Sequence, residues 1–310
     1  MYKINNFKIL FSLVERNTKS YFKNKFMFFM SLITPLILLI LFVTFLRNVY
    51  IDSIKNALPS EIQISGRLIN GLAGAWLMSS ILSVSSVTVA FCSNIVMIED
   101  KIYGNILDFK VAPVKSTTVS LSYFISNFFV TFAVMMCVML IGHIYLAAVG
   151  WYITVGDFFM IILDCICGVL FGTLLAGLVE NFVNTQGGLS AVSTLVSSMY
   201  GFICGAYMPL SSFSSGLRSV LGLLPGTYGV GILRNHYMNG YLKELTDLGI
   251  PQENINGIKN AFDINLFVFD NKIPLGAMYG ILLGACLILF AAFVVMILLK
   301  DKKKRSKKQL

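Results

Sequence analysis

The sequence predicts an all-α polytopic membrane protein, and three observations lead to this class. First, 56% of the 310 residues are hydrophobic and only 13% are charged, whereas soluble domains carry about 25% charged residues. Second, six apolar runs reach the length of about 20 residues that a helix needs to cross a bilayer. Third, basic residues cluster before the first run and after the last, as is typical of segments that flank membrane spans.

An amphipathic segment comes first. Between residues 4 and 19, apolar side chains fall on one arc of a helix and polar or charged ones on another: Ile4, Phe7, Leu10, Phe11 and Val14 against Lys8, Ser12, Glu15, Arg16 and Lys19. A helix with this pattern lies flat in the membrane interface. We therefore expect an interfacial elbow helix over residues 4–23. The long first apolar run, with charges well before it, argues against a cleavable signal peptide.

The six apolar runs give the expected transmembrane helices: residues 26–46, 68–98, 119–149, 158–179, 187–209 and 275–299. The second run is long enough to tilt or to protrude. An even number of spans puts both termini on one side, and that side would carry 16 of the 24 Lys and Arg residues. The positive-inside rule then predicts that both termini are cytoplasmic.

The segment between the second and third spans, residues 97–115, is charged. It holds six ionisable residues: Glu99, Asp100, Lys101, Asp108, Lys110 and Lys115. Each would cost about 2.5–3.5 kcal/mol in hydrocarbon, so the segment must leave the membrane. Apolar residues recur within it at helical spacing before a proline: Ile102, Ile106 and Phe109, then Pro113. We expect a short amphipathic helix over residues 99–115 at the cytoplasmic face, where a soluble partner can push on it.

Two segments without a full span follow the fifth run. Residues 211–240 are apolar but are interrupted by Gly216, Gly222, Pro225, Gly226, Gly229 and Gly231. Neither half reaches about 20 residues, so a pair of short re-entrant helices is expected there. Residues 241–273 are polar and predict a small external cap.

Three patterns occur in order along the chain. ERNTKSYFKNKFMFFMSLITPLILLILF places an interfacial segment before a first span with an early proline, Pro35. IEDKIYGNILDFKVAPVKSTTVSLSYFI has an acidic residue, a basic residue, a glycine and a proline: Glu99, Lys101, Gly104 and Pro113. MPLSSFSSGLRSVLGLLPGTYGVGILR has Pro-x-Thr-Tyr and a terminal Arg: Pro225, Thr227, Tyr228 and Arg234. Together they cover nearly the whole chain and resemble the permease subunit of type-2 ATP-binding-cassette exporters, the family that includes daunorubicin-type drug exporters.

This resemblance implies that the chain works with a second permease, either another copy or a related chain, and with separate ATPase subunits. The sequence has no G-x-x-x-x-G-K-[ST] motif, so ATP and Mg²⁺ would bind to the partner, and this chain would be a transport subunit without a cofactor of its own rather than an enzyme. The 99–115 helix would dock on the ATPase, whose closure would tilt the adjoining spans. Six residues would carry the coupling: Glu99, Asp100, Lys101, Gly104, Asp108 and Pro113.

Polar residues inside the expected spans have two interpretations. Serines recur at helical spacing on the second and fifth spans: Ser79, Ser83 and Ser86, and Ser190, Ser193 and Ser197. Such stripes mark close helix packing, or else they line a substrate route between two permeases. His143 and Asp164 lie at similar depth on consecutive antiparallel spans, and they could form a hydrogen-bonded pair or serve proton coupling. The six cysteines lie within apolar runs, so we interpret them as buried hydrophobic residues. No metal site is expected.

Composition and motifs then favour one function over three others. The favoured function is ATP-driven export of an amphipathic compound, such as a drug, a peptide antibiotic or a lipid-like molecule, across a bacterial plasma membrane. Export of a lipid-linked glycan is the alternative, although the cap is larger than in compact polysaccharide exporters of the family. An intramembrane hydrolase would need paired Asp residues on facing helices, a Ser–His or Ser–Lys dyad or H-E-x-x-H, and none is recognisable. The basic clusters flank spans, which indicates contact with membrane lipids rather than with nucleic acid.

Overall fold

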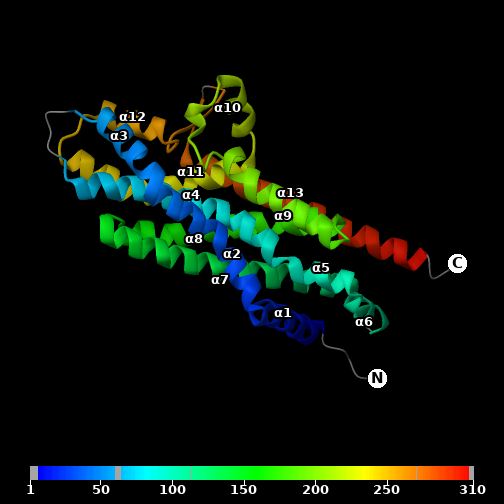
Figure 1. Cartoon of the computed structure of the whole chain (residues 1–310). Coiled ribbons are helices and arrows are strands. Elements are labelled where there is room, and N and C mark those ends of the chain that lie inside the picture. The colour runs from blue at the N-terminus through cyan, green and yellow to red at the C-terminus, as the bar shows by residue number, and fades with distance from the viewer. Residues whose placement is uncertain (1–5, 60–63, 113, 270, 307–310) are drawn as a thin grey trace.

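The computed structural model describes residues 6–59, 64–112, 114–269 and 271–306, and in this part of the chain it confirms an all-α polytopic class. The helices form an elongated bundle, and the N- and C-terminal ends lie at the same end of it (Figure 1). We call this the terminal end, and the opposite end, which carries α3 and α12, the cap end.

The elements follow one another with short connections. In order they are α1 Asn6–Lys23, α2 Lys25–Leu41, the π-helical turn η1 Phe42–Leu46, α3 Arg47–Ala57, α4 Gly66–Ser93, α5 Ile95–Ile102, η2 Asn105–Leu107, α6 Asp108–Val111, α7 Ser116–Val149, α8 Val155–Val179, η3 Glu180–Phe182, α9 Gln186–Ile203, η4 Leu210–Ser212, α10 Ser215–Gly222, α11 Pro225–Asp247, α12 Gln252–Ala261, β1 Leu266–Val268, β2 Asn271–Ile273 and α13 Leu275–Ser306. The two strands form one antiparallel hairpin, with Leu266 opposite Ile273.

Five helical stretches within the described residues are long and apolar enough to cross a membrane: Lys25–Ala57, Gly66–Ile102, Ser116–Val149, Val155–Phe182 and Leu275–Leu299. The expected span over 187–209 is not among them. Its helix, α9, ends at Ile203, because the chain then turns at Gly205, which has a φ of +74°. A positive φ is favourable for glycine and stops the helix before the predicted end.

The first span also differs from its expected limits, 26–46. The helix continues through a π-helical turn into α3, so that it runs from Lys25 to Ala57. The extension is polar overall, but Tyr50 and Ile54 are buried and join the main hydrophobic core. Packing against the bundle therefore prolongs the helix beyond its apolar part.

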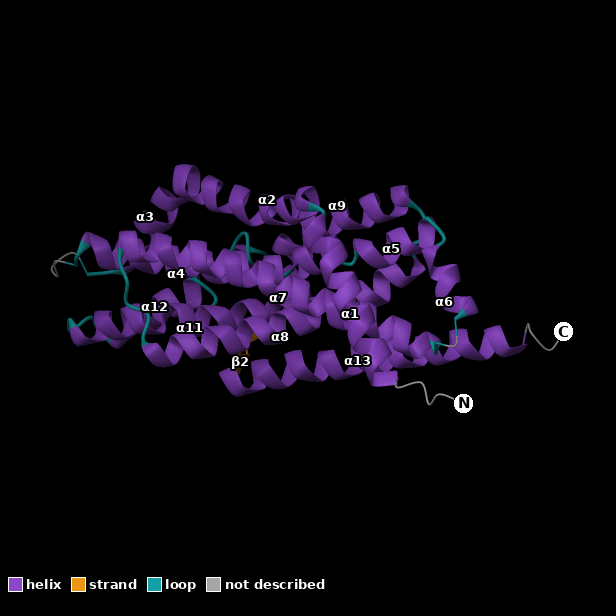
Figure 2. Ribbon diagram, turned by 90° about the horizontal axis from the view of Figure 1, so that it is seen from below, coloured by secondary structure: helices purple, strands orange, loops and turns teal. Residues whose placement is uncertain are grey.

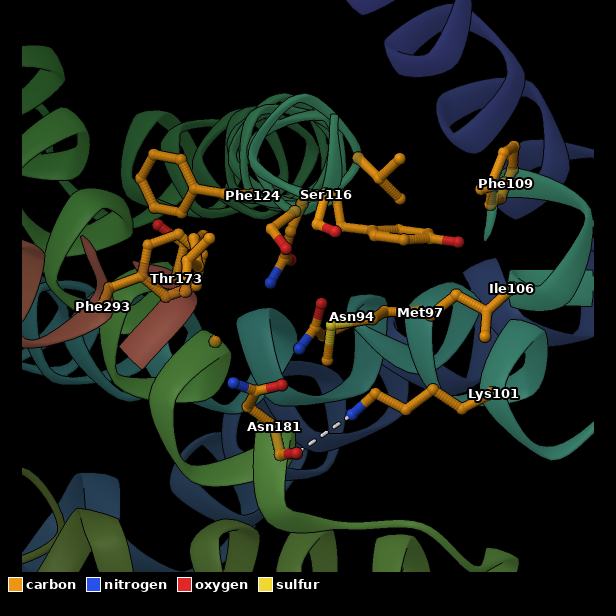
Figure 3. A pocket seen from close by; sticks show the side chains of 16 residues that line it. Asn94, Met97, Lys101, Ile106, Phe109, Ser116, Phe124, Thr173, Asn181 and Phe293 are labelled. Carbon is orange, nitrogen blue, oxygen red and sulfur yellow. Dashed lines mark hydrogen bonds between the residues drawn. The ribbon is translucent and has the colours of Figure 1, made fainter. Parts of the chain in front are cut away.

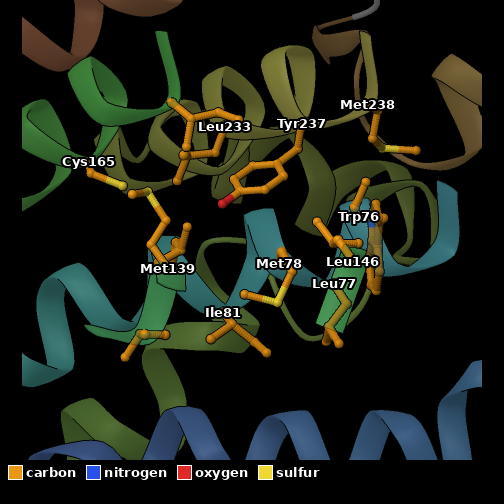
Figure 4. Close-up of a cluster of buried hydrophobic side chains, with 14 of the residues drawn as sticks. Trp76, Leu77, Met78, Ile81, Met139, Leu146, Cys165, Leu233, Tyr237 and Met238 are labelled. Atoms are coloured by element: carbon orange, nitrogen blue, oxygen red, sulfur yellow. The ribbon is translucent and has the colours of Figure 1, made fainter. Parts of the chain in front are cut away.

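The α4 helix is the centre of the bundle, and it packs against α2, α7, α8, α9 and α11. Within the stretch Gly66–Ile102, which includes α4, 89% of an 18-residue apolar segment is buried inside the bundle. The corresponding share is 22% for the first and last candidate spans. Small residues permit this close approach: a side chain at Gly172 of α8 would collide with the α4 backbone at Ser86, and Gly142 of α7 lies directly against Met78. Around it lies the main core cluster, in which Trp76, Met78 and Tyr237 meet (Figure 4).

The region after α9 corrects two expectations. Helix α11 has 23 residues and continues to Asp247, so neither the short second re-entrant helix nor a cap boundary at residue 241 is correct. Its glycines do not break it. Instead, Gly226 and Gly231 give room to the side chains of Tyr200 and Leu266. The helix is buried because it packs against α4, α8 and α13.

Two edges of the bundle are less covered. Figure 2 shows α2 and α9 along one edge and α13 along the opposite edge, with α4 and α7 between them. Both edges expose large apolar side chains within the candidate spans and α9, including Phe29, Ile37 and Leu195 on one edge and Leu287 and Ile288 on the other. Exposed apolar surface of this extent is suited to lipid or to a second membrane protein.

Candidate functional site

The charged segment begins at a bend in the helix. α4 ends at Ser93 and α5 begins at Ile95, with Asn94 between them. The Asn94 side chain donates a hydrogen bond from Nδ2 to Oε2 of Glu180 at 2.8 Å, and both residues are buried. Because Glu180 directly follows α8, this bond attaches the bend to the end of α8.

Asp100 is the buried carboxylate of α5. The Arg16 guanidinium of α1 binds it through two N–H groups, with Nη2 2.8 Å from Oδ1 and Nη1 at Oδ2. Tyr123 of α7 donates its hydroxyl to the same carboxylate, and Asn105 donates from Nδ2 at 3.0 Å. The hydrogen bond with Asp100 raises the pKa of the Arg16 guanidinium above its usual value. Asp100 thus joins α5 to α1 and α7.

Lys101, the next residue, points to the other side. Its ammonium donates to the backbone carbonyls of Glu180, Asn181 and Val183, at Nζ–O distances of 3.3, 3.2 and 3.4 Å (Figure 3). These carbonyls lie where α8 ends and the connection to α9 begins, at the negative end of the α8 dipole. Two consecutive side chains therefore bind α5 to different neighbours.

The expected single helix over residues 99–115 is wrong. α5 ends at Ile102, and Gly104 has a φ of +81°, in the left-handed region. The chain reverses there and continues as the short turns η2 and α6. Gly104 was expected within the helix, but in the structure its left-handed conformation interrupts it.

The reversal leaves three large apolar side chains exposed at the terminal end. Tyr103, Leu107 and Val111 have 67%, 55% and 87% of their surface accessible. We call these three residues the apolar tip. Asp108, the first residue of α6, is exposed beside them, and Glu99 is half-buried on α5. Pro113 lies outside the described residues.

A second polar cluster lies toward the cap end, around Arg234. This side chain is 1% exposed, and its Nη1 lies 3.2 Å from Oδ2 of Asp263. Its Nη2 donates to the carbonyl of Gly205 at 2.7 Å, and the guanidinium lies 5.0 Å from the ring centroid of Trp76. Asp263 also accepts hydrogen bonds from the backbone N–H groups of Leu210 and Ser211. This cluster ties α11, the α9–α10 connection and the chain after α12 together.

The other residues predicted in this region hold the start of α11. Pro225 is its first residue, where the missing N–H costs nothing. Thr227 donates its hydroxyl to the carbonyl of Leu221 at 2.8 Å, and Tyr228 donates to that of Gly222 at 2.7 Å. Both acceptors belong to α10, so these hydrogen bonds fix the turn between α10 and α11.

The structure does not join His143 to Asp164. Asp164 is instead bonded to His236 of α11, with 2.7 Å between Oδ2 and Nδ1, and it accepts a hydrogen bond from the hydroxyl of Tyr279 of α13. His143 has a partner on the same helix as His236, because the Tyr237 hydroxyl lies 3.3 Å from its Nε2. The predicted pair fails because α11 supplies a separate partner to each side chain, His236 to Asp164 and Tyr237 to His143.

The two serine stripes lie in different surroundings. Ser79, Ser83 and Ser86 are buried within the chain, and the hydroxyls of Ser79 and Ser86 donate to carbonyls of their own helix at 2.6 and 2.7 Å. On α9, Ser190 is exposed, whereas Ser193 and Ser197 are half-buried. Ser197 also lines a cavity of about 390 Å³ between α2, α4 and α9.

Sequence reasoning missed three partners that complete these clusters: Arg16, Glu180 and Asp263. Arg16 was assigned to the polar face of the interfacial helix, where a buried ion pair is not expected. Glu180 had a visible signal, since it is a carboxylate at the end of an apolar run. Asp263 had none, because it lies among other polar residues of the expected cap.

A family model described as ABC-2 type transporter matches residues 9–238, which is more than half of the chain. The matched range contains α5, the apolar tip and Arg234. No curated protein and no solved structure matches the chain.

Proposed function

The chain belongs to the ABC-2 type transporter family, as the transmembrane permease subunit, and from this premise we propose that it exports an amphipathic compound with energy from a separate ATPase. A drug, a peptide antibiotic or a lipid-like molecule is the proposed substrate class. ATP and Mg²⁺ would be bound by the ATPase, and this chain would convert the motion of that partner into movement of its own helices.

One observation carries the proposal: α5 is bound through adjacent residues to helices on two sides. Asp100 is attached to α1 and α7, and Lys101 to the end of α8. The apolar tip follows α5 directly and exposes Tyr103, Leu107 and Val111. A partner seated on the tip would therefore move α5, and the ion pair and hydrogen bonds would pass that movement to α1, α7 and α8.

The proposed orientation places the terminal end in the cytoplasm of a bacterial cell. This end carries the basic clusters near both termini, and such clusters are retained on the cytoplasmic side. α1 supports the same orientation, because it exposes Phe7 and Phe11 beside lysines, as expected of a helix in the inner interface. The tip would then be accessible to a cytoplasmic ATPase.

A second permease copy is proposed to pack against the edge formed by α2 and α9. This edge exposes apolar side chains from both helices, among them Phe29, Ile33 and Ile37, and Leu195, Met199 and Phe202. The cavity between α2, α4 and α9 opens here and includes Ser197. A substrate route between two copies would thus follow the serines of α9, Ser190, Ser193 and Ser197, rather than the buried serines of α4.

The direct test is to charge the tip. Leu107→Asp combined with Val111→Asp should abolish retention of the ATPase on the purified permease and all substrate-stimulated ATP hydrolysis, because an apolar docking surface would become anionic. The matched control is Leu248→Asp, which charges an exposed apolar residue at the cap end. Full coupling in the double variant would refute docking at the tip.

The proposed second copy can be tested by disulfide cross-linking. A cysteine at Leu195 of α9 should cross-link two copies in native membranes, because symmetric dimers bring equivalent surfaces together. A cysteine at Leu287, exposed on the opposite edge, is the control and should remain monomeric. Dimers formed through Leu287→Cys alone would place the interface on α13.

A further inference from the structure

A small cavity lies inside the bundle, beside the Asp164 cluster of α8, α11 and α13. Side chains from α4, α7, α8, α9, α11 and α13 line it, and its volume is about 10 Å³. Because one water molecule needs about 10–15 Å³, this central cavity is too small for a substrate but has the size of a single-water site. Figure 4 labels two residues of its wall, Cys165 of α8 and Leu233 of α11.

Three hydroxyl groups line the central cavity: those of Ser83 and Ser86 on α4 and that of Tyr200 on α9. Glycines of α11 leave space in front of two of them. Among the described residues, Ser83 Oγ is the one atom of another helix within 4 Å of a Cβ added at Gly229, at 3.8 Å. A Cβ added at Gly226 would lie 2.5 Å from the Tyr200 oxygen. Residues three apart are neighbours on a helix surface, so both hydroxyls face the same side of α11.

Two of these hydroxyls find no hydrogen-bond partner among the described residues. Ser86 donates to the carbonyl of Ser83 at 2.7 Å, but neither Ser83 Oγ nor the Tyr200 hydroxyl is bonded to another described group. Ser83 is 3% exposed, so bulk solvent does not reach it. A buried hydroxyl without a partner is unfavourable, and ordered water commonly supplies the missing hydrogen bond.

Asp164 completes the polar part of the wall. Its carboxyl group is hydrogen-bonded to His236 and Tyr279, and each carboxyl oxygen can accept a further hydrogen bond. The cavity is therefore lined by two hydroxyls that can donate and by one group that can accept. A water molecule matches this set, because it can accept from both hydroxyls and donate to the carboxyl group. A cation would leave both hydroxyl protons without an acceptor.

The helix that carries Tyr200, α9, is held mainly by apolar contacts. In the described part of the chain its side-chain hydrogen bonds are local: Ser198 donates to a carbonyl of α9, and the Tyr207 hydroxyl, just after the helix, donates to the carbonyl of Ser197. Its buried residues are Leu189 and Gly201. A water molecule bonded to Tyr200 would therefore attach α9 to polar groups of α4 and α8.

We propose that the central cavity binds one water molecule, which accepts hydrogen bonds from Ser83 and Tyr200 and donates one to Asp164. The water extends the Asp164 cluster of α8, α11 and α13 to α4 and α9. The site depends on the fold and not on transport. One consequence rests on the proposed function: the water fixes the position of α9 at the edge where a second copy is proposed to pack.

The test fills the cavity and measures the sign of the stability change. Gly229→Ala adds one methyl group, which enters the cavity beside Ser83 without a collision. The unfolding temperature of the full chain in lipid nanodiscs should fall by about 3–6 °C, because the water leaves and the hydroxyls lose their partner.

The matched controls are Gly280→Ala and Gly284→Ala on α13, because alanine is itself more favourable than glycine in a helix. An added Cβ at either position has no described atom of another element within 4 Å, so both variants should be at least as stable as the parent protein. A rise for Gly229→Ala equal to that of the controls would show that the cavity is dry, and it would overturn the proposal.

Removing the hydroxyls separates the loss of water from a steric effect. In a background of Ser83→Ala and Tyr200→Phe, the methyl group of Gly229→Ala should no longer lower the unfolding temperature, because no hydroxyl then needs the water. A fall that persists in this background would show a collision and would contradict the proposal. Tyr200→Phe alone should also lower the unfolding temperature, whereas a rise would mean that its hydroxyl has no partner in the parent protein.

Two further measurements identify the occupant. Replacing sodium and potassium by choline should not change the difference between the parent protein and Gly229→Ala, and a difference that depends on either ion would assign a cation instead. A cryo-EM map that resolves ordered water should show a peak within hydrogen-bonding distance of Ser83, Tyr200 and Asp164, and Gly229→Ala should lack it. A parent map without this peak would refute the site. The peak together with a missing Leu195→Cys cross-link would refute the proposed second copy and leave the water site intact.

Discussion

Two arginine–aspartate pairs hold the two ends of the molecule, and they differ in their exposure to solvent. At the cap end, the side chains of Arg234 and Asp263 are 1% and 6% exposed. At the terminal end, Asp100 is 5% exposed but Arg16 is 40% exposed. Both pairs join elements that are distant in sequence, yet one is sealed and the other lies at the surface.

The difference bears on which end can move. A sealed pair cannot be broken without leaving a charge in a low-dielectric interior, which costs about 3–5 kcal/mol. At the terminal end, Arg16 can exchange its partner for water, and Asp100 keeps its bonds to Tyr123 and Asn105. The Arg234 cluster is therefore a fixed anchor for the cap end, whereas the Arg16 pair lies where solvent can reach it.

The largest effect should come from breaking the sealed pair. Asp263→Ala leaves the Arg234 guanidinium without its counter-charge and removes the acceptor for two backbone N–H groups. We expect a loss of about 3–5 kcal/mol and a fall in the unfolding temperature of about 10 °C. Loss of the monodisperse peak on heating in detergent measures this. Asp263→Ala combined with Arg234→Met should recover part of the loss, and a double variant no better than Asp263→Ala would show that the pair is not the cause.

The second prediction concerns the buried pair of α8 and α11. A double-mutant cycle on Asp164→Asn and His236→Gln should give a coupling energy of about 1–3 kcal/mol, because the two side chains are in contact. The same cycle on Asp164→Asn and His143→Gln should be additive within about 0.5 kcal/mol. Coupling in the second cycle and not in the first would restore the pairing expected from the sequence.

The third prediction uses the surface pair. Arg16→Gln should cost only about 1 kcal/mol of stability, because its charge lies partly in water. Substrate-stimulated ATP hydrolysis in the complex should nevertheless fall strongly, while the ATPase stays bound through the apolar tip. Arg16→Lys keeps the charge but not the two-point geometry, so it should recover part of the coupling. A fully coupled Arg16→Gln complex would show that α1 does not receive the movement.

The smallest effect sharpens the same contrast. Lys19 and Glu15 form an exposed pair one turn apart on α1, with 65% and 50% of their side chains accessible. Lys19→Gln should change stability by less than about 0.5 kcal/mol and leave coupling intact. A loss of coupling as large as that of Arg16→Gln would mean that the charge of α1 as a whole matters rather than the Asp100 contact.

The sequence predicts those features that depend on the solvent around each segment. Long apolar runs must cross the membrane, so the fold class follows from the runs themselves, and residues 97–115 could be placed outside hydrocarbon because of their charges. The helix ends predicted from the fifth apolar run onward were wrong. Gly205 stops α9, whereas Gly226 and Gly231 allow α11 to pack closely against its neighbours. The sequence alone does not distinguish a glycine that ends a helix from one that permits close packing within a helix, because the neighbouring side chains decide its role.

The candidate site was predictable by location but not by partner. Asp100 and Lys101 were recognised as important, yet the identity of their partners depends on how α1 and α8 pack against α5. His143 and Asp164 show the same limit, since they are at similar depth but α11 provides a separate partner for each. Periodicity and depth restrict where a side chain can lie, while three-dimensional contacts decide what it binds.

The enclosure of α4 also has a consequence for biosynthesis. This helix leaves the ribosome early, but its burial requires α11, which is made much later. In the meantime α4 must remain in the bilayer, where the hydroxyls of Ser79 and Ser86 keep their hydrogen bonds to carbonyls of their own helix. A nascent chain released before Pro225 would expose the small-residue surface of α4 to lipid, and we expect membrane proteases to degrade it faster than a chain released after Asp247.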